Sequence, residues 1–169
     1  MPISQTILRQ SALQTQAAAA STLLEAKARG VRTAFLCHSH KDHTLVTGLV
    51  NLLRSAGWRV YVDWADSSMP DTPNQETARK IQRKIVDLDY FLFLATANSM
   101  ASRWCPWEIG YADGTKPNDR ILIVPTKDGA TTHGNEYLEL YRRIDLSTQG
   151  EVAAWQPGTS NHGVLVRSL

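Results

Sequence analysis

Short apolar runs alternate with segments of helical periodicity along most of this 169-residue chain. The runs are TAFLC (33–37), WRVYV (58–62), YFLFLA (90–95) and ILIVP (121–125). Strands that alternate with helices form a parallel sheet with helices on both faces. YFLFLA and ILIVP show no polar alternation, which is typical of strands covered on both sides. The sequence therefore predicts a doubly wound α/β domain.

Capping residues and glycines predict the ends of the first helix after TAFLC. Ser39 and Asp42 have the spacing of a capping box, and Gly57 is placed to end the helix. The apolar residues between them fall at helical spacing and are predicted to be buried: Leu45, Leu49, Leu52, Leu53 and Ala56.

The later elements follow by the same reasoning. Thr72 is the predicted cap of a second helix, with Pro73 as its first residue and Gln75 as the partner in a capping box. Its apolar face is predicted to hold Ala78, Ile81, Ile85 and Leu88. Residues 99–113 are predicted to be helical, with a break before Pro106 and a stop at Gly114. A short helix at 136–141 and an edge strand at 142–146 complete the pattern.

The N-terminal segment is rich in alanine and free of Pro and Gly from Ser4 to Ala28, which predicts one long helix ending at Gly30. Its narrow apolar stripe, formed by Leu13, Ala17, Ala20 and Leu24, is expected to pack on the following domain rather than on a partner. The predicted organisation is an N-terminal helix (1–30), an α/β domain (31–146) and a tail (147–169) that packs on the domain or extends it.

Composition narrows the function classes. The formal net charge of +2 is too small to favour nucleic acid as a partner. No apolar run approaches the ~20 residues that span a bilayer, so no membrane partner is expected. Two cysteines favour reduced thiols and a cytoplasmic location. Residues 1–24 contain no acid, which leaves a transit peptide as a minor alternative.

In a parallel sheet of this kind, ligands bind beyond the carboxyl ends of the strands, where the strand order reverses. Four segments leave those ends: 37–40, 63–66, 96–108 and 125–128. The first belongs to the heptapeptide CHSHKDH (37–43), which contains three of the five histidines and one of the two cysteines.

The heptapeptide has three interpretations. Cys37, His38, His40 and His43 are all metal-ligand types, but Cys37 and His38 point to opposite faces of a strand end and no second cluster completes the set. Cys37 with a histidine base would be a nucleophile, although a cysteine that ends a buried strand is more often inert. We favour a turn that lines a cleft, and we expect no metal.

The segment SRWCPWEIGYA places Glu108 in the first turn of a helix, four residues after Trp104. An acid there complements the helix dipole, and tryptophans commonly fill a core. Taken alone, the segment is therefore compatible with a purely structural role.

Together, TAFLCHSHKDHTLVTGLVNLLRSAGWRVYVDW, DYFLFLATANSMASRW and WCPWEIGYA resemble a TIR domain of the bacterial kind over residues 31–146. The resemblance implies a flavodoxin-like, five-stranded parallel sheet. It also implies either assembly as a scaffold or cleavage of NAD+ at the nicotinamide–ribose bond. Short bacterial chains of this kind resemble the signal-producing component of Thoeris-type anti-phage defence.

In catalytic members of the family, the glutamate of the Trp-Cys-x-x-Glu segment is essential. The resemblance places this glutamate at Glu108. The expected product is ADP-ribose or a cyclic ADP-ribose that reaches a separate effector protein. NAD+ is then a substrate, and no cofactor is expected. Trp104 matches a position at the border of the pocket. The other substrate-binding candidates lie at the strand ends: Cys37, His38, Ser39, Asp63, Trp64 and Ser99.

Two alternatives remain at this stage. In a non-catalytic interaction module, Glu108 is only a helix-end acid. A receiver-like nucleotide binder shares the fold, but an acidic pair after the first strand is missing. The loop DWADSSMPDTPNQ contains Pro70 without the Gly that often follows it in the family, which weakens the case for TIR–TIR self-association through that loop.

Overall fold

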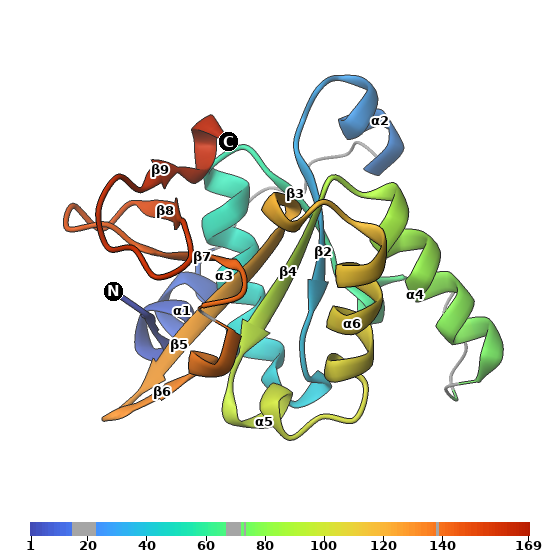
Figure 1. Cartoon of the computed structure of the whole chain (residues 1–169), viewed down its shortest axis with the longest axis horizontal. Coiled ribbons are helices and arrows are strands. Elements are labelled where there is room, and N and C mark those ends of the chain that lie inside the picture. The colour runs from blue at the N-terminus through green and yellow to red at the C-terminus, as the bar shows by residue number, and fades with distance from the viewer. Residues whose placement is uncertain (15–22, 67–71, 73, 138) are drawn as a thin grey trace.

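The computed structural model describes residues 1–14, 23–66, 72, 74–137 and 139–169. Its centre is a parallel sheet of five strands in the order β3-β2-β4-β5-β7. These are β2 (Thr33–Cys37), β3 (Arg59–Tyr61), β4 (Tyr90–Ala95), β5 (Ile121–Asp128) and β7 (Arg142–Leu146). The first of them along the chain, β2, lies between the second and the third. The flavodoxin-like, doubly wound sheet predicted from the sequence is confirmed (Figure 1).

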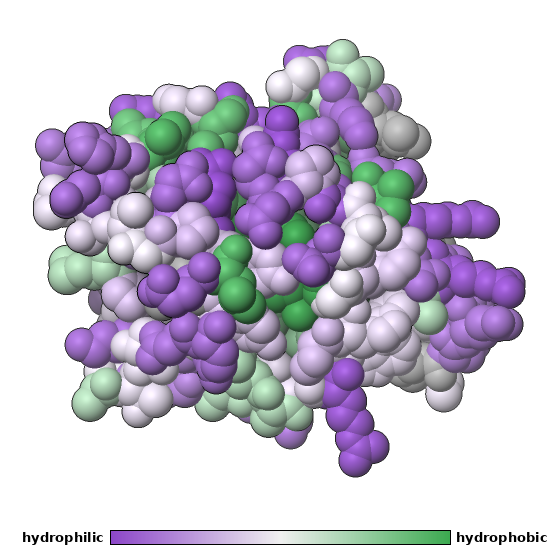
Figure 2. Space-filling view, viewed as in Figure 1, coloured by the Kyte–Doolittle hydropathy of each residue, from purple (hydrophilic) through white to green (hydrophobic). Residues whose placement is uncertain are grey.

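Helices cover both faces of the sheet (Figure 1). On one face, α3 (His43–Ser55) packs Leu45, Val46, Leu49 and Leu53 against alternate strand residues such as Leu36 and Leu92. On the other, α4 (Gln75–Asp87) and α6 (Cys105–Thr115) pack Ile81, Ile85, Ile109 and Ala112 against Phe35, Phe91 and Phe93. Successive strand residues point to opposite faces, so each apolar run supplies both cores. Outside the cores, hydrophilic residues predominate on the face shown in Figure 2, and apolar residues form small separate patches there.

Two predicted capping boxes are wrong: α4 is capped by another residue, and Ser39 caps a different helix without Asp42 as its partner. Asn74 caps α4, and its box partner is Thr77, three residues later. Ser39 caps the short 3₁₀ helix η1 (His40–Asp42) by accepting from the Lys41 N–H. Asp42 turns inward instead, and it accepts hydrogen bonds from the Thr96 hydroxyl and the Asn98 amide.

The chain between β4 and β5 is helical in two pieces, α5 (Ala97–Met100) and α6. The predicted break before Pro106 is confirmed, since α6 begins at Cys105 with Pro106 in its first turn. Gly114 lies inside α6 rather than beyond its end, because the helix continues to Thr115.

The single helix predicted from Ser4 to Ala28 is wrong. The chain begins with β1 (Ile3–Ser4), which pairs with the far end of β5, and Ser4 caps α1 (Gln5–Ala12). α1 packs closely on α3, where a Cβ at Gly48 would lie 1.9 Å from the Leu8 carbonyl oxygen. Leu13 follows the end of α1 and is 83% exposed, and α2 (Leu23–Ala28) is a separate helix. Ala17 and Ala20 lie outside the described residues.

The C-terminal residues continue the sheet, so the prediction of β7 as an edge strand is wrong. β8 (Val152–Trp155) pairs antiparallel with β7, β9 (Val164–Leu165) pairs with β8, and the 3₁₀ helix η5 (Val166–Ser168) follows. The short helix expected at 136–141 is a 3₁₀ turn, η4 (Asn135–Tyr137). Smaller elements are β6 (Thr131–His133), paired with β5, and the 3₁₀ turns η2 (Asp63–Ala65) and η3 (Asn118–Arg120). Among the described residues, no helix combines the length and apolarity needed to cross a membrane.

Candidate active site

A cleft of about 210 Å³ opens beyond the carboxyl ends of β2 and β3, beside the first turns of α4 and α6. Five sequence-predicted residues line it: His38, Ser39, Asp63, Trp104 and Glu108. The β2–α3 turn, the β3–α4 connection and the start of α6 thus converge on one hollow. The start of α6 follows β4, so the cleft borders the point between β2 and β4 where the strand order reverses, which is where a parallel sheet of this kind binds ligands.

Glu108 lies in the first turn of α6 and is only 6% exposed. It shares a helix face with Cys105 and Ala112, which pack on the sheet, so its carboxyl faces the floor of the cleft. Burial raises the pKa of Glu108 to about 8; a hydrogen bond from Cys37 opposes this rise, and negative charge at Cys105 and Asp63 adds to it. A carboxyl group held in this way favours a nearby positive charge, which would stabilise its ionised form.

Trp104 and Ser102 form the α6 side of the cleft. The Ser102 hydroxyl accepts from the backbone N–H groups of Trp104 and Cys105, which fixes the entry into the helix. Trp104 is 37% exposed and meets Trp107 edge to face, with ring centroids 5.4 Å apart. The site therefore has an aromatic lip on which a planar ring can stack.

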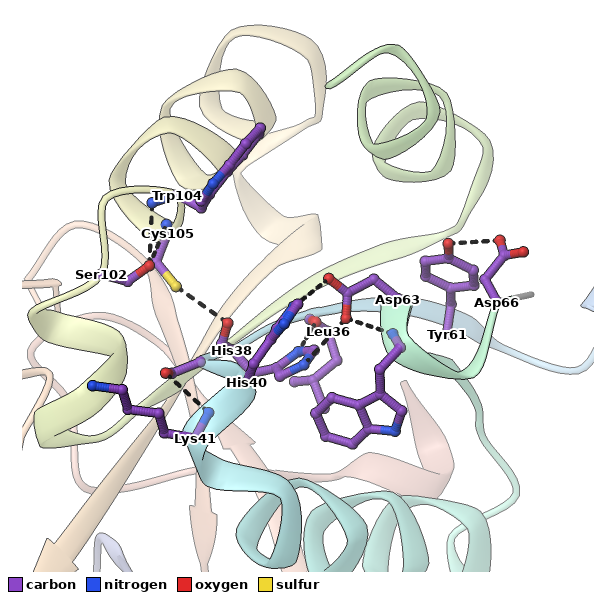
Figure 3. Close-up of polar contacts among 12 residues, drawn as sticks. Leu36, His38, His40, Lys41, Tyr61, Asp63, Asp66, Ser102, Trp104 and Cys105 are labelled. Carbon is purple, nitrogen blue, oxygen red and sulfur yellow. Dashed lines mark hydrogen bonds and ion pairs between the residues drawn. The ribbon is translucent and has the colours of Figure 1, made fainter. Parts of the chain in front are cut away.

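The opposite side contains two histidines that point at one carboxylate, as Figure 3 shows. Nε2 of His40 lies 3.0 Å from Oδ2 of Asp63, and Nε2 of His38 lies 3.3 Å from Oδ1. Burial alone raises the pKa of Asp63, but the two nearby histidines outweigh it and lower the pKa to about 2. Possible ligand atoms of these three residues lie within 4.8 Å of one another, so they are the described residues with the geometry to hold a metal ion.

Three predicted substrate-binding residues do not line the cleft. Cys37 is completely buried, and burial keeps its pKa well above the ordinary value, so it is a protonated thiol rather than a nucleophile. Trp64 packs against His38 and His43, with ring centroids 4.5 and 4.6 Å away. Ser99 is completely buried and donates its hydroxyl to the Leu94 carbonyl while capping α5 with Thr96.

Four lining residues were not predicted as site residues: His40, Thr77, Ile81 and Ser102. The sequence indicates His40 only as a possible metal ligand and Ile81 only as a core residue. Ser102 has a sequence signal, since a serine just before a helical segment is a typical cap. Thr77 gives none, because its place at the cleft depends on how α4 packs.

A larger hollow of about 430 Å³ lies along β3, between Trp58 and Lys84. It is a less suitable active site because its polar groups are used locally. Tyr61 donates to Asp66, and the Lys84 ammonium lies over the Tyr61 ring. The cleft at Glu108 combines a buried carboxyl group with an open aromatic ring, and chemistry is better placed there.

The parallel sheet, the cleft at its carboxyl edge and the buried glutamate are the features that the resemblance to TIR domains implies. The model of the TIR domain family matches residues 34–156, and the chain belongs to that family.

Two curated relatives show which kind of protein within the family this chain resembles. The chain is 36% identical over 117 residues to "Probable 3' cyclic ADP-D-ribose synthase ThsB'" of Bacillus cereus (strain MSX-D12), a match that covers 68% of this chain and 61% of that protein. It is 24% identical over 85 residues to "Putative cyclic ADP-D-ribose synthase TIR2" of Cytobacillus dafuensis, which covers 48% of this chain and 22% of that protein. The matched region thus spans about three fifths of the first relative and about a fifth of the second.

Proposed function

We propose that this protein cleaves NAD+ at the nicotinamide–ribose bond and releases ADP-ribose or a cyclic ADP-ribose. The observation that carries the proposal is the buried carboxyl group of Glu108 in the cleft that Trp104 and Ser39 also line. The names of the two relatives, "Probable 3' cyclic ADP-D-ribose synthase ThsB'" and "Putative cyclic ADP-D-ribose synthase TIR2", support the same reaction.

One carboxylate is enough for this reaction. Hydrolysis of an ordinary glycoside needs a second acid, which protonates the departing oxygen. Nicotinamide leaves NAD+ as a neutral molecule from a cationic nitrogen, so no proton has to be supplied. The remaining task is to stabilise the positive charge that develops on the ribose, and a fixed carboxylate in a poorly solvated cleft does this. Glu108 also accepts hydrogen bonds from ribose hydroxyls in this proposal.

The other lining residues have positioning roles in the proposal. Trp104 stacks on the nicotinamide or adenine ring. The hydroxyl of Ser39 accepts from Lys41 and keeps its own proton to donate to a pyrophosphate oxygen. His38 and Asp63 form the wall beside it.

Water and a hydroxyl of the bound nucleotide compete for the ribosyl carbon. Attack by water gives ADP-ribose, and attack by the hydroxyl gives a cyclic product. We propose cyclisation as the main outcome, since both relatives are named synthases of cyclic ADP-D-ribose. In this proposal the product is a diffusible signal in antiviral defence, read by a separate effector protein in the cytoplasm, and the enzyme self-associates through its TIR domain.

The test is to incubate the purified protein with NAD+ and to measure nicotinamide and the nucleotide products by chromatography. Glu108→Gln keeps the size of the side chain and removes its charge, and Glu136→Gln on the exposed turn η4 is the matched control. Because the proposal includes self-association, the assay is run at low and high protein concentration and with a crowding agent. We expect nicotinamide release by the parent and by Glu136→Gln, and a loss of at least about 100-fold in Glu108→Gln.

Equal cleavage by Glu108→Gln would show that the site is wrongly assigned. Absence of nicotinamide under all three conditions would favour the non-catalytic interaction module.

A further inference from the structure

The Nε2 atom of His38 is buried and has no hydrogen-bond partner. The side chain of His38 is 2% exposed, and its Nδ1 lies 2.8 Å from the Leu36 carbonyl oxygen. A carbonyl oxygen only accepts, so Nδ1 must carry a proton. In the neutral ring, Nε2 then presents a lone pair.

That lone pair faces another acceptor. Oδ1 of Asp63 lies 3.3 Å from Nε2 of His38, too close for two electron-rich atoms unless a positive charge lies between them. A proton on His38 is one solution. It places an imidazolium next to His40, whose ring is stacked on His38 with centroids 5.8 Å apart and which is hydrogen-bonded to the same carboxylate.

The distances match a metal site. Ligands of a tetrahedral Zn²⁺ ion, with bonds of about 2.0–2.1 Å, are separated from one another by roughly 3.3 Å. The two contacts of Asp63 are close to this separation, at 3.0 Å from Oδ2 to His40 and 3.3 Å from Oδ1 to His38, and all three side chains offer a ligand atom within 4.8 Å of the others. A histidine ligand typically donates its other ring N–H to a backbone carbonyl, which His38 does through Leu36.

We propose that Nε2 of His38, Nε2 of His40 and the Asp63 carboxylate bind one divalent transition-metal ion, with Zn²⁺ as the best match to two imidazoles and a carboxylate. Three protein ligands leave the fourth position to water or to a ligand in the cleft. The sequence disfavours a metal site in the heptapeptide because no second cluster of Cys or His completes the ligand set. Asp63 supplies the third ligand from the end of β3.

Binding of the metal ion should change the affinity for NAD+, an expectation that rests on the proposed function. The ion lies in the wall of the cleft beside Ser39, where the pyrophosphate of NAD+ is proposed to bind, and it adds positive charge there. Zn²⁺ is therefore expected to lower the KM for NAD+.

The decisive experiment measures metal binding without NAD+. Chelator-treated full-length protein without a histidine tag is titrated with Zn²⁺ by calorimetry and with Co²⁺ by visible absorption. We expect one equivalent of Zn²⁺ and the absorption bands of tetrahedral Co²⁺. His40 is the preferred site of substitution because its side chain is 72% exposed and its loss does not threaten folding.

Even changes in groups that only orient a ligand weaken metal binding roughly 10- to 100-fold, so His40→Ala should weaken it by at least about 100-fold. Asp63→Asn should do the same, with folding checked by circular dichroism. His133→Ala and His162→Ala, which remove histidines outside the cluster, should bind as the parent does. Failure of the parent to bind saturably, or unchanged affinity in His40→Ala, overturns the metal site whatever the outcome with NAD+.

The kinetic consequence is tested separately, by the Zn²⁺ dependence of KM in the parent and in His40→Ala. A KM that falls with Zn²⁺ in the parent alone supports recognition of the pyrophosphate by the ion. A KM that does not fall in a parent shown to bind Zn²⁺ overturns that consequence and leaves both the metal site and the NAD+ activity in place.

Discussion

Asp42 accepts a 2.5 Å hydrogen bond from the Thr96 hydroxyl, and this contact joins the turn after β2 to the turn after β4. The second oxygen of Asp42 accepts from Asn98 at 2.6 Å, and Asp42 itself is 5% exposed. The two connections beside the reversal of strand order are therefore fixed to each other at the edge of the sheet that carries the cleft.

Loss of the hydrogen bonds to Asp42 should lower the free energy of unfolding. Asp42→Ala leaves the buried Thr96 hydroxyl and the Asn98 amide without their acceptor, so we expect the free energy of unfolding to fall by about 2–4 kcal/mol. Urea denaturation at pH 7 measures the change. Asp119→Ala, at an exposed position on η3, should stay within about 0.5 kcal/mol of the parent. A similar small effect in Asp42→Ala would contradict the structural role.

The pH dependence of catalysis should reflect Glu108. Its pKa of about 8 in the free protein means that the required carboxylate forms only as the pH rises toward that value. We expect kcat/KM for NAD+ to rise about tenfold per pH unit below pH 8 and to level off above it. The positive charge of bound NAD+ favours the carboxylate, so the corresponding limb of kcat should lie at lower pH. A kcat/KM profile that is flat from pH 6 to 9 would exclude Glu108 as the group that must ionise.

The stability of the fold should also depend on the ionisation of Glu108, but in the opposite direction: it should fall as the pH rises. Between pH 4.5 and about 8, the unfolded chain has released the Glu108 proton and the folded protein retains it, so stability falls as pH rises through this window. The full difference in pKa corresponds to on the order of 5 kcal/mol. The unfolding free energy of the parent minus that of Glu108→Gln should decline from pH 5 to pH 8 and then become constant. An unchanging difference would show that the carboxyl group titrates normally.

Trp104 should act mainly on substrate affinity. Its exposed ring offers stacking worth about 0.5–1.5 kcal/mol, so Trp104→Ala should raise the KM for NAD+ roughly two- to tenfold with a smaller change in kcat. Trp104→Phe keeps an aromatic face and should recover most of the affinity. Equal losses in the two variants would point to packing against Trp107 rather than to stacking on the substrate.

Substitution by alanine should change the stability in opposite directions at two glycines. Gly48→Ala puts a methyl group into the backbone of Leu8 and should separate α1 from α3, which we expect to destabilise the fold by more than about 2 kcal/mol. Gly114 lies inside α6 with open space around it, so Gly114→Ala should stabilise by about 0.5–1 kcal/mol. Thermal denaturation distinguishes them by the sign of the shift in Tm.

The parts of the fold that the sequence predicts well are those with local signals. β2 and β4 coincide with their apolar runs. Of the predicted apolar face of α4, Ile81 and Ile85 are buried, as is Leu88 just past the helix end, whereas Ala78 is only partly buried. The prediction of one N-terminal helix was wrong because tertiary contacts set the start of this segment: β1 pairs with β5, and α1 docks where Gly48 leaves room and ends at Ala12.

The candidate site shows the same division. Glu108 and Trp104 belong to one short segment, and Ser39 and His38 to another, so local reasoning finds them. The convergence of His38 and His40 on Asp63 could not be predicted, because it depends on the register of β2 with β3. Ser99 illustrates the reverse: it lies in a strand-end segment, but it turns inward to cap a helix.

Four strands have an open side within the described part of the sheet, and each is very short: β1 and β9 have two residues, and β3 and β6 have three. A border of that length exposes too few unpaired amides and carbonyls to template a foreign chain. Any larger particles that form in concentrated solution should consequently arise through side-chain surfaces rather than by strand-to-strand growth.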